Sequence, residues 1–528
     1  MPDKPELYTW GLWSLSMSDE NGLFDAPPTL DIGFTFNHKS PGLTLLFYPH
    51  SEDWASEVRV AWYSVPPEYE YRRDRNSGFI QVEVYSGVII KSGTYTISST
   101  VGQIVENIVN FRHIKIEFLS TNIRHRFVKM SGINYGQGRS FQDSDIDTAS
   151  ILEEIDPTSN EITINTLNFR IKTHNPEFSL VSGVGDDMLM SNQQMTIIGD
   201  QKEFGTFFLQ FPWKDVHGNG TVIDFQAVDA IGVMDKYDFW GDVYVDVPIE
   251  TLIGQLFAIC FPTQLIRYVI DPVFAGLRVS GWIPKCKCRQ ALQYICFVIG
   301  AVADDSRRDY VWIYKPDTEI SGVVDKRYMG PTIEPTTYYS GVDVISYEYA
   351  LSDETMEAFK GVLPAGQKPI RFNEPINNIQ ISSGATILSK SANHAIINVT
   401  VPGEITITGN RYIVNQTVFS ERAEVPAGEV ENIKTYDNCT LMSPAYAPKR
   451  AGSLFAYLKQ RTQWTGDIRL EDREVGYKYE IPTASRTYSG QVYQGLPIQG
   501  TAEQLDINMR GNRARMKVIG DVVDRSSI

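Results

Sequence analysis

An acidic run comes nearest in this sequence to a known metal-binding pattern. Four carboxylates fall at the first, third, fifth and twelfth positions of a calcium-binding EF-hand loop: Asp143, Asp145, Asp147 and Glu154. Such a loop needs glycine at its sixth position, where this chain has Thr148, and Pro157 would interrupt the helix that should follow. The run is therefore interpreted as an exposed acidic turn, and we expect no bound metal.

No set of residues with catalytic spacing is found. Glu153 and Glu154 could be read as a glycosidase pair, but adjacent side chains point in different directions and cannot flank one sugar. The sequence has no nucleophile elbow, phosphate-binding loop or dinucleotide-binding fingerprint. Seven histidines occur without metal-ligand spacing, namely His38, His50, His113, His125, His174, His217 and His394. We therefore predict no catalytic residues, no cofactor and no enzymatic activity.

The cysteines are too sparse to form a disulfide scaffold. There are five in 528 residues: Cys260, Cys286, Cys288, Cys296 and Cys439. Cys286 and Cys288 have no second pair at zinc-site spacing. We predict five reduced thiols, which suits assembly in a cytoplasm.

The charge balance argues against a protein that grips nucleic acid. The chain has 48 Lys and Arg against 64 Asp and Glu, a formal net charge of −16. Phosphate contacts need clustered basic residues. No signal peptide is visible, and the longest apolar stretches, residues 252–261 and 291–303, are too short or too interrupted to span a bilayer. We expect no stable membrane insertion.

Aromatic and β-branched residues predict a mainly β fold with minor α/β content. Within residues 1–129, short apolar runs such as 30–36 and 58–63 alternate with turn residues, which is typical of a jelly-roll-like β-sandwich. Aromatic residues can stack on sugars, so a carbohydrate-binding role for this sandwich stays open, with Trp54, Trp62 and Tyr63 as candidates. The same residues would also suit a sandwich core.

A strand-rich segment and a mixed segment follow. Residues 161–171 alternate strictly between polar and apolar, and with later strands they could close a first barrel over residues 130–245. Apolar residues at helical spacing predict helices after Pro248 and over residues 289–301, within a mixed α/β module at 246–318.

The remainder is again β-rich. Residues 319–450 begin with a linker and continue with expected strands at 342–349, 376–381, 395–401, 404–408 and 412–419. A helix is expected at 454–461, within a second barrel over residues 451–528. Residues 205–209 with 222–232 weakly resemble residues 490–493 with 505–520, which is compatible with two copies of one barrel or with general β composition.

Taken in order, several segments resemble the hub family of phage tails. This family comprises baseplate hubs and late-control-type proteins of contractile tails and the tail-associated hub proteins of long non-contractile tails. The resemblance covers roughly residues 125–525. It rests on FVKMSGINYG (127–136), ASILEEIDP (149–157), INTLNFRI (164–171), GTFFL (205–209), AVDAIG (227–232), SGWIP (280–284), ALQ (291–293) and GAVAD (300–304).

The resemblance implies a structural virion protein at the tail tip. It implies two tube-type barrels per subunit, flanking the mixed module, and a homotrimer whose ring adapts a sixfold tube to threefold tip components. Implied partners are the tail tube, distal tail proteins and a tip spike, fibre or plug, with DNA passing through the lumen during genome ejection. A lumen lined by Asp and Glu would repel that DNA. The alternatives are a carbohydrate-binding receptor protein and a tail-associated cell-wall hydrolase.

Overall fold

The chain has a mainly β fold with few helices. The computed structural model of the protein describes residues 12–48, 53–74, 78–84, 87–134, 145–173, 194–199, 202–210, 214–215, 221–262, 266–324, 332–425, 430–470, 473–493, 495–509, 511 and 513–524. Strands account for 57% and helices for 11%, which confirms the predicted fold class. No helix among these residues is long and apolar enough to cross a membrane. The chain divides into two compact units, Met1–Gln142 and Asp143–Ile528.

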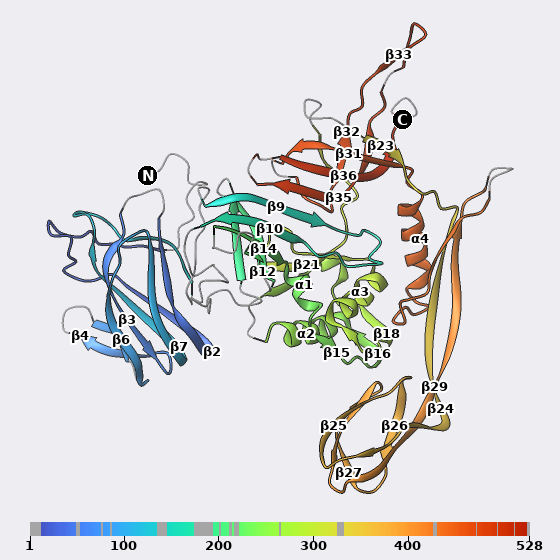
Figure 1. Ribbon diagram of the computed structural model, residues 1–528, viewed down its shortest axis with the longest axis horizontal. Helices are drawn as coiled ribbons and strands as arrows, with labels where there is room; N and C mark the ends of the chain where they lie inside the picture. The colour runs from blue at the N-terminus through green and yellow to red at the C-terminus, as the bar shows by residue number, and fades with distance from the viewer. Residues whose placement is uncertain are drawn as a thin grey trace. The chain divides into compact units, whose positions relative to one another are not determined.

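The first unit is built on a six-stranded antiparallel sheet in the order β1-β8-β2-β7-β3-β6 (Figure 1). Its strands are β1 (Leu12–Trp13), β2 (Thr29–Phe47), β3 (Ala55–Tyr63), β6 (Ile89–Thr96), β7 (Val101–Thr121) and β8 (Lys129–Asn134). A separate hairpin pairs β4 (Glu68–Asp74) with β5 (Gly78–Val84). Alternation along β3 buries Val58, Val60 and Trp62 in the core of this unit.

Long strands with register shifts build the first unit. The described strands β1 to β3 and β6 to β8 belong to one hydrogen-bonded path, and their buried side chains share one core. β2 pairs with β7 along nearly its whole length, with register shifts, and its last four residues, Thr44–Phe47, also pair with β8. Gly42 lies at one such shift, where a Cβ would collide with the backbone carbonyl of Ile104.

The second unit is dominated by a twelve-stranded sheet. Its main path is β11-β12-β14-β10-β9-β35-β36-β31-β23, with β13 paired to β14 and with β22 and β32 attached through β35. The strands are β9 (Ile146–Glu154), β10 (Thr166–Lys172), β11 (Gln194–Gly199), β12 (Lys202–Leu209), β13 (Lys214–Asp215), β14 (Val222–Val228), β22 (Ile320–Val323), β23 (Thr332–Pro335), β31 (Thr462–Arg469), β32 (Lys478–Ile481), β35 (Ile498–Asn508) and β36 (Arg513–Val522).

Two strand sets that are far apart in sequence meet in this sheet. They fall within the segments predicted to form separate barrels, residues 130–245 and 451–528. β9 pairs antiparallel with β35, from Glu154 opposite Gln504 to Ser150 opposite Asn508. The two sets therefore share one sheet, and the described residues contain no closed barrel. Each set supplies hydrogen-bond partners for the edge strand of the other. In a barrel, the first and last strands would pair with each other instead.

Three helices and several short strands form the mixed module. The helices are α1 (Ala230–Met234), α2 (Ile249–Cys260) and α3 (Cys288–Ile299), with a 3-10 turn η3 (Pro272–Phe274). The strands are β15 (Asp238–Phe239), β16 (Val243–Pro248), β17 (Arg267–Ile270), β18 (Arg278–Trp282), β19 (Cys286–Lys287), β20 (Val302–Asp304) and β21 (Tyr310–Tyr314). α2 and α3 confirm the two predicted helices, and both bury apolar faces in one core.

A long ribbon of two strands leads from the mixed module to a smaller module, which we call the distal module. The ribbon consists of β24 (Gly341–Leu363) and β29 (Gly403–Arg422), with β30 (Ile433–Tyr436) and β26 (Ile376–Ile381) paired at its two ends. The distal module adds a sheet of β25 (Gly366–Arg371), β28 (His394–Val399) and β27 (Ala385–Ser391). It has its own core, which includes Ile370, Ile397 and Ile407. Figure 1 shows this module at the far end of the ribbon.

The last helix and hairpin differ in detail from their predictions. α4 (Ala447–Leu458) packs on β24 and β29 and begins before residue 454, because Pro448 is well suited to a first helical turn. β33 (Arg486–Tyr488) and β34 (Gln491–Tyr493) form an isolated hairpin that projects from the large sheet (Figure 1). β34 is thus outside that sheet whereas β12 is within it, so these two segments are not equivalent.

Candidate functional site

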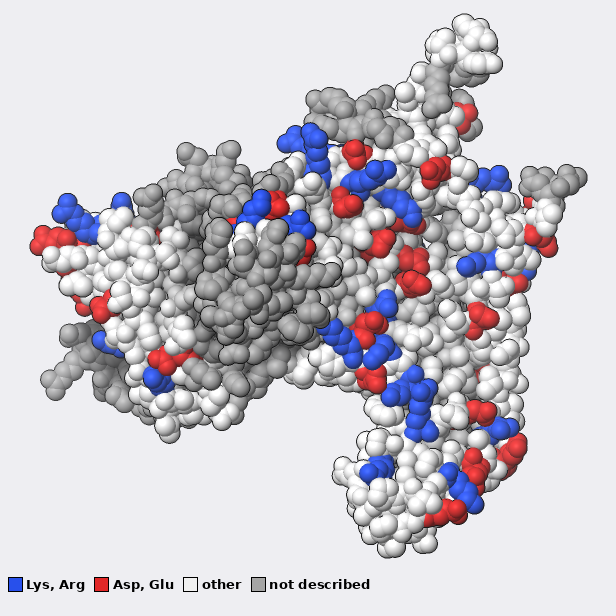
Figure 2. All heavy atoms as spheres, viewed as in Figure 1, with Lys and Arg blue, Asp and Glu red and all other residues white. Residues whose placement is uncertain are grey.

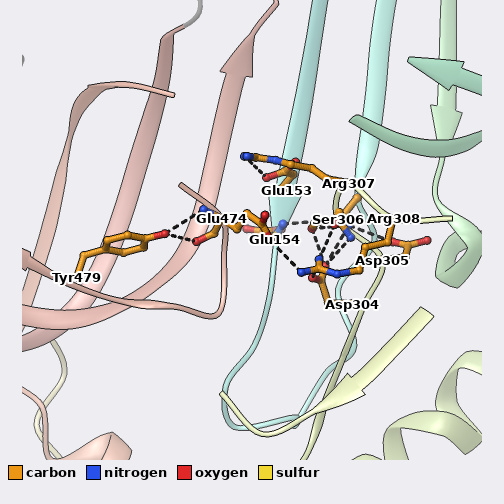
Figure 3. Close-up of polar contacts among 10 residues, drawn as sticks. Glu153, Glu154, Asp304, Asp305, Ser306, Arg307, Arg308, Glu474 and Tyr479 are labelled. Carbon is orange, nitrogen blue, oxygen red and sulfur yellow. Dashed lines mark hydrogen bonds and ion pairs between the residues drawn. The ribbon is translucent and has the colours of Figure 1, made fainter. Parts of the chain in front are cut away.

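A buried ion pair joins β9 to the loop between β20 and β21. Glu153 lies on β9 with 1% of its surface exposed, and Arg307 reaches it from that loop. The Arg307 Nε and Nη2 atoms donate to Glu153 Oε1 and Oε2, each over 2.9 Å. Burial disfavours the charged guanidinium, but Glu153 more than offsets this, and the pKa of Arg307 is raised overall. The pair is bidentate, the strongest geometry for these groups (Figure 3).

The next residue links the same loop to the C-terminal strands. Arg308 Nη2 donates to Glu474 Oε2 over 2.8 Å, and its Nη1 lies 3.5 Å from Asp304 Oδ2. The guanidinium also lies 4.9 Å from the ring centre of Trp312. Glu474 is held in turn by Tyr479, whose hydroxyl accepts a hydrogen bond from the Glu474 backbone (Figure 3). The loop therefore bridges both strand sets of the large sheet.

Two buried aspartates meet at the start of α1. Asp229 caps this helix by accepting from the backbone N–H of Gly232 over 2.6 Å, and Asp305 accepts from that of Ala230 over 2.9 Å. The negative charge of Asp229 also disfavours ionisation of Asp305. Burial raises the pKa of Asp229 to about 7 and that of Asp305 well above its usual value.

Asn165 completes the hydrogen-bond network around these acids. Its backbone N–H donates to Asp229 Oδ2 over 2.6 Å. Its side-chain amide donates to Asp305 Oδ1 over 3.2 Å and to Ser306 Oγ over 3.1 Å, and its carbonyl accepts from the Glu154 N–H over 2.9 Å. Asn165 therefore ties β9, α1 and the 304–308 loop together.

We call these groups the polar junction: Glu153, Asn165, Asp229, Asp304, Asp305, Ser306, Arg307, Arg308 and Glu474. Its carboxylates at 153, 229, 304 and 305 have exposures of 6% or less. A reacting group must be reached by substrate, so this burial suits a structural role. Through these ion pairs and hydrogen bonds, the polar junction fixes the two strand sets to the mixed module.

A second polar contact holds the distal module against the mixed module. Asn393, at the turn between β27 and β28, donates to the carbonyls of Trp240 and Ile283 over 2.8 Å each. It also accepts from Trp282 Nε1 over 2.6 Å and is 3% exposed. Gly241 has a φ of +64°, and a Cβ there would lie 2.9 Å from the Asn393 amide nitrogen. The distal module is thus attached at its turn as well as through the ribbon.

The acidic run does not form the calcium loop in its described part. Ile146–Glu154 is strand β9, whereas the pattern would need a loop over these positions. Asp147 pairs with Lys172 over 2.5 Å, and Asp145 begins the described segment. Asp143 lies outside the described residues. Glu153 is buried, while Glu154 on the opposite face of β9 is partly exposed.

The sugar-stacking candidates are mostly inside the first unit. Trp62 is 1% exposed and Tyr63 8% exposed, so neither ring has a free face for a sugar. Trp54 is partly buried, and its indole N–H donates to the Ile97 carbonyl over 3.0 Å. These three aromatics therefore contribute to packing.

Two of the described histidines make hydrogen bonds to neighbouring side chains, and the cysteines are free thiols. His113 is buried and lies 2.9 Å from Asp31 Oδ1, and His394 bonds to Ser391 Oγ over 2.7 Å. His50, His174 and His217 lie outside the described residues. All five cysteines are free thiols, as predicted, and all but Cys286 are buried. No cluster of potential metal ligands occurs among the described side chains.

The residues of the polar junction were not recognised from the sequence. Residues 304–309 read Asp-Asp-Ser-Arg-Arg-Asp, a run that ordinarily marks a solvated turn. Its one distinguishing signal is its place between two strongly apolar strands, β20 and β21. Nothing near Asn393 marks it as a contact residue.

Comparison with known proteins gives matches in structure but not in sequence. No protein-family model matches the chain, and no curated protein matches its sequence. A tail protein from Neisseria meningitidis MC58 is similar at 12% identity, covering 71% of this chain and 93% of that chain, with a TM-score of 0.40. The 43 kDa tail protein of prophage MuSo2 from Shewanella oneidensis is similar at 10% identity, covering 73% and 96%, with a TM-score of 0.39.

Prophage tail protein gp18 from Listeria monocytogenes EGD-e is also similar, at 11% identity. The match covers 73% of this chain and 92% of that chain, with a TM-score of 0.37. The Neisseria protein is a tail protein, and the Shewanella and Listeria proteins are prophage tail proteins.

Proposed function

We propose that this chain is a structural hub that closes the tail tube at the tip or baseplate of a phage or phage-derived tail. In this proposal three copies form a ring that adapts a sixfold tube to threefold tip components. The protein acts by geometry, without catalysis or a cofactor. It is assembled in the host cytoplasm and resides at the tail tip of the virion.

The pairing of β9 with β35 is the observation that supports this proposal. Each chain supplies two strand sets, one before and one after the mixed module, and both belong to the same sheet. Three copies therefore supply six sets, which is the number needed to meet a sixfold tube. The polar junction gives this arrangement rigidity because it fixes both sets to the same loop.

The proposed partners follow from this position. The ring contacts the tail tube and distal tail proteins on one side and a spike, fibre or plug on the other. DNA passes through its lumen during genome ejection without specific binding. On the face shown in Figure 2, basic and acidic side chains of the described residues are interspersed, without a broad basic patch of the kind that phosphate binding uses.

Electron microscopy of the purified chain at high concentration tests the proposal. Two-dimensional class averages are expected to contain threefold rings with a central hole at least as wide as a DNA duplex. A chain that stays monomeric alone is next mixed with purified tail tube and neighbouring tip proteins. Failure to form rings or to bind under both conditions would overturn the hub function.

The two alternative functions have direct assays. A glycan array measures sugar binding by the first unit, and the burial of Trp62 and Tyr63 gives no support to such binding. A peptidoglycan zymogram measures cell-wall hydrolysis. We expect neither assay to give a signal, and a reproducible signal in one of them would replace the purely structural role.

A further inference from the structure

A short turn, residues 391–394, holds the distal module against the mixed module, and we call it the docking turn. Besides the hydrogen bonds already described, the backbone N–H of Ala392 donates to Asp242 Oδ1 over 2.8 Å. The ring centres of His394 and Trp240 lie 4.4 Å apart. Each of these contacts joins the two modules, so all of them break when the distal module moves away.

The distal module can move without unfolding. Its hydrophobic core is formed by side chains from residues 356–407 alone, so it does not depend on the mixed module. The ribbon of β24 and β29 keeps the two modules connected when the docking turn is released. The contacts of the turn are hydrogen bonds and one ring contact, which form and break more readily than a shared apolar core.

His394 is the group in the docking turn whose charge changes near neutral pH. It is 8% exposed, so water reaches little of its ring. Its Nδ1 atom lies 2.7 Å from Ser391 Oγ. A hydroxyl can donate to this nitrogen only while the nitrogen carries no proton. The docked contact therefore suits a neutral imidazole.

The charges around His394 also disfavour a proton on it. They are Asp242 and Lys285 of the mixed module, Asp238, which pairs with Lys285 over 3.1 Å, and Arg371, which lies opposite His394 on β25. Lys285 Nζ lies 4.3 Å from the centre of the Trp240 ring, so a protonated His394 would be a second cation on that ring. Burial lowers the pKa of His394, Lys285 lowers it further and Asp242 opposes this.

We propose that protonation of His394 releases the distal module from the mixed module, so that the docking turn is a pH-sensitive latch. In the undocked module the histidine returns to water and to its ordinary pKa of about 6.5. Because the docked pKa is lower, the docking contact is fully stable above the undocked value and is weakened as pH falls below it. Release uncovers Trp240 and Trp282 while the ribbon retains the module. This device is independent of the proposed hub function.

Hydrogen exchange of the full chain at about pH 7.5 and about pH 5.5 tests the latch. The Ala392 amide is the reporter, because its hydrogen bond to Asp242 crosses the contact. Mass spectrometry gives its rate relative to the intrinsic rate at the same pH, which removes the direct effect of pH on exchange. We expect protection of the docking turn to fall about threefold or more at the lower pH. Protection that is equal at the two pH values would overturn the proposal.

His394→Phe identifies the group that titrates. Phenylalanine keeps an aromatic ring against Trp240 and takes up no proton, so we expect protection of the docking turn to become independent of pH. The matched control is His38→Phe in the first unit, where burial also lowers the histidine pKa. H38F is expected to keep the wild-type pH dependence at the docking turn. A fall in H394F as large as that in the wild type would assign the effect to another group.

A titration of His394 by nuclear magnetic resonance tests the same coupling without relying on H394F to dock. The signal of its ring Cε1–H is assigned as the one that H394F lacks. Docking and protonation affect each other reciprocally, so undocking must raise the pKa of His394. We expect a higher pKa in N393A, which lacks the hydrogen bonds of Asn393 to the mixed module, than in the wild type. Equal pKa values in the two proteins would overturn the latch.

Discussion

At the scale of single residues, the ion pair of Glu153 with Arg307 is buried, whereas other ion pairs, such as Arg267 with Asp309, are exposed to solvent. Replacing Glu153 by Gln leaves the buried Arg307 charge without its bidentate carboxylate partner. The expected loss is about 3–5 kcal/mol in the free energy of unfolding of the second unit. Urea denaturation followed by tryptophan fluorescence measures this loss.

The matched control is Arg267→Ala, which breaks a pair with Asp309 close to the same loop. This pair spans 3.1 Å, but its side chains are 70% and 63% exposed, so water screens it. We expect a loss of less than about 1 kcal/mol. Equal losses in the two variants would show that the buried pair has no special role.

The Asp229–Asp305 pair makes stability depend on pH. Burial raises both pKa values in the folded state, that of Asp229 to about 7, above their ordinary values in the unfolded chain. The stabilisation is therefore complete below the unfolded pKa and is lost as pH rises through the folded one. Asp305→Asn removes one of the two buried groups that titrate, so we expect its unfolding free energy to fall less between about pH 5 and pH 8 than that of the wild type. Urea titrations at several pH values measure the difference, and parallel curves would contradict it.

At the scale of elements, helices were easier to predict than the ribbon. α2 and α3 bury one face each, so apolar residues recur at helical spacing and locate them well. β29 was expected as two strands, at 404–408 and 412–419, because Gly409 and Asn410 resemble a turn. In the structure both continue the ladder with β24, and a Cβ at Gly409 would lie 2.8 Å from the Asn377 carbonyl. The exposed ribbon has no buried face along residues 411–418 and so no alternating pattern.

Attachment of the distal module depends on Asn393. Asn393→Ala removes three hydrogen bonds and leaves the Trp240 and Ile283 carbonyls without this donor. We expect faster hydrogen exchange at residues 391–394 and in the β16–β18 pair, and a loss of about 2–4 kcal/mol in the unfolding free energy. Gln367→Ala, an exposed change on β25 of the same module, is the control. Unchanged exchange at residues 391–394 would contradict a role for Asn393 in attachment.

At the scale of the whole molecule, the polar junction could not be found from sequence because its members are far apart in the chain. Glu153 and Arg307 are separated by 154 residues, and Arg308 and Glu474 by 166. Alternation on β9 predicts that Glu153 and Leu152 point to opposite faces. Only the structure shows that the loop with Arg307 covers the face on which Glu153 lies. The partner of Glu153 therefore cannot be recognised from the residues that flank it in the sequence.

The charge of the whole chain predicts how it behaves toward DNA. The chain has a net charge of −16, and acidic and basic side chains are interspersed on the face shown in Figure 2. We therefore expect the protein to repel a DNA duplex, most strongly at low salt, where charges are screened least. We expect the fluorescence anisotropy of a labelled duplex to stay constant on addition of the protein, both at about 150 mM salt and at about 20 mM, where the Debye length is longer. A protein that grips phosphates would instead bind tightly at low salt, with an affinity falling steeply as salt is added. Such a salt-dependent signal would mean that the described surface or the ring lumen holds DNA, and passage without binding would have to be abandoned.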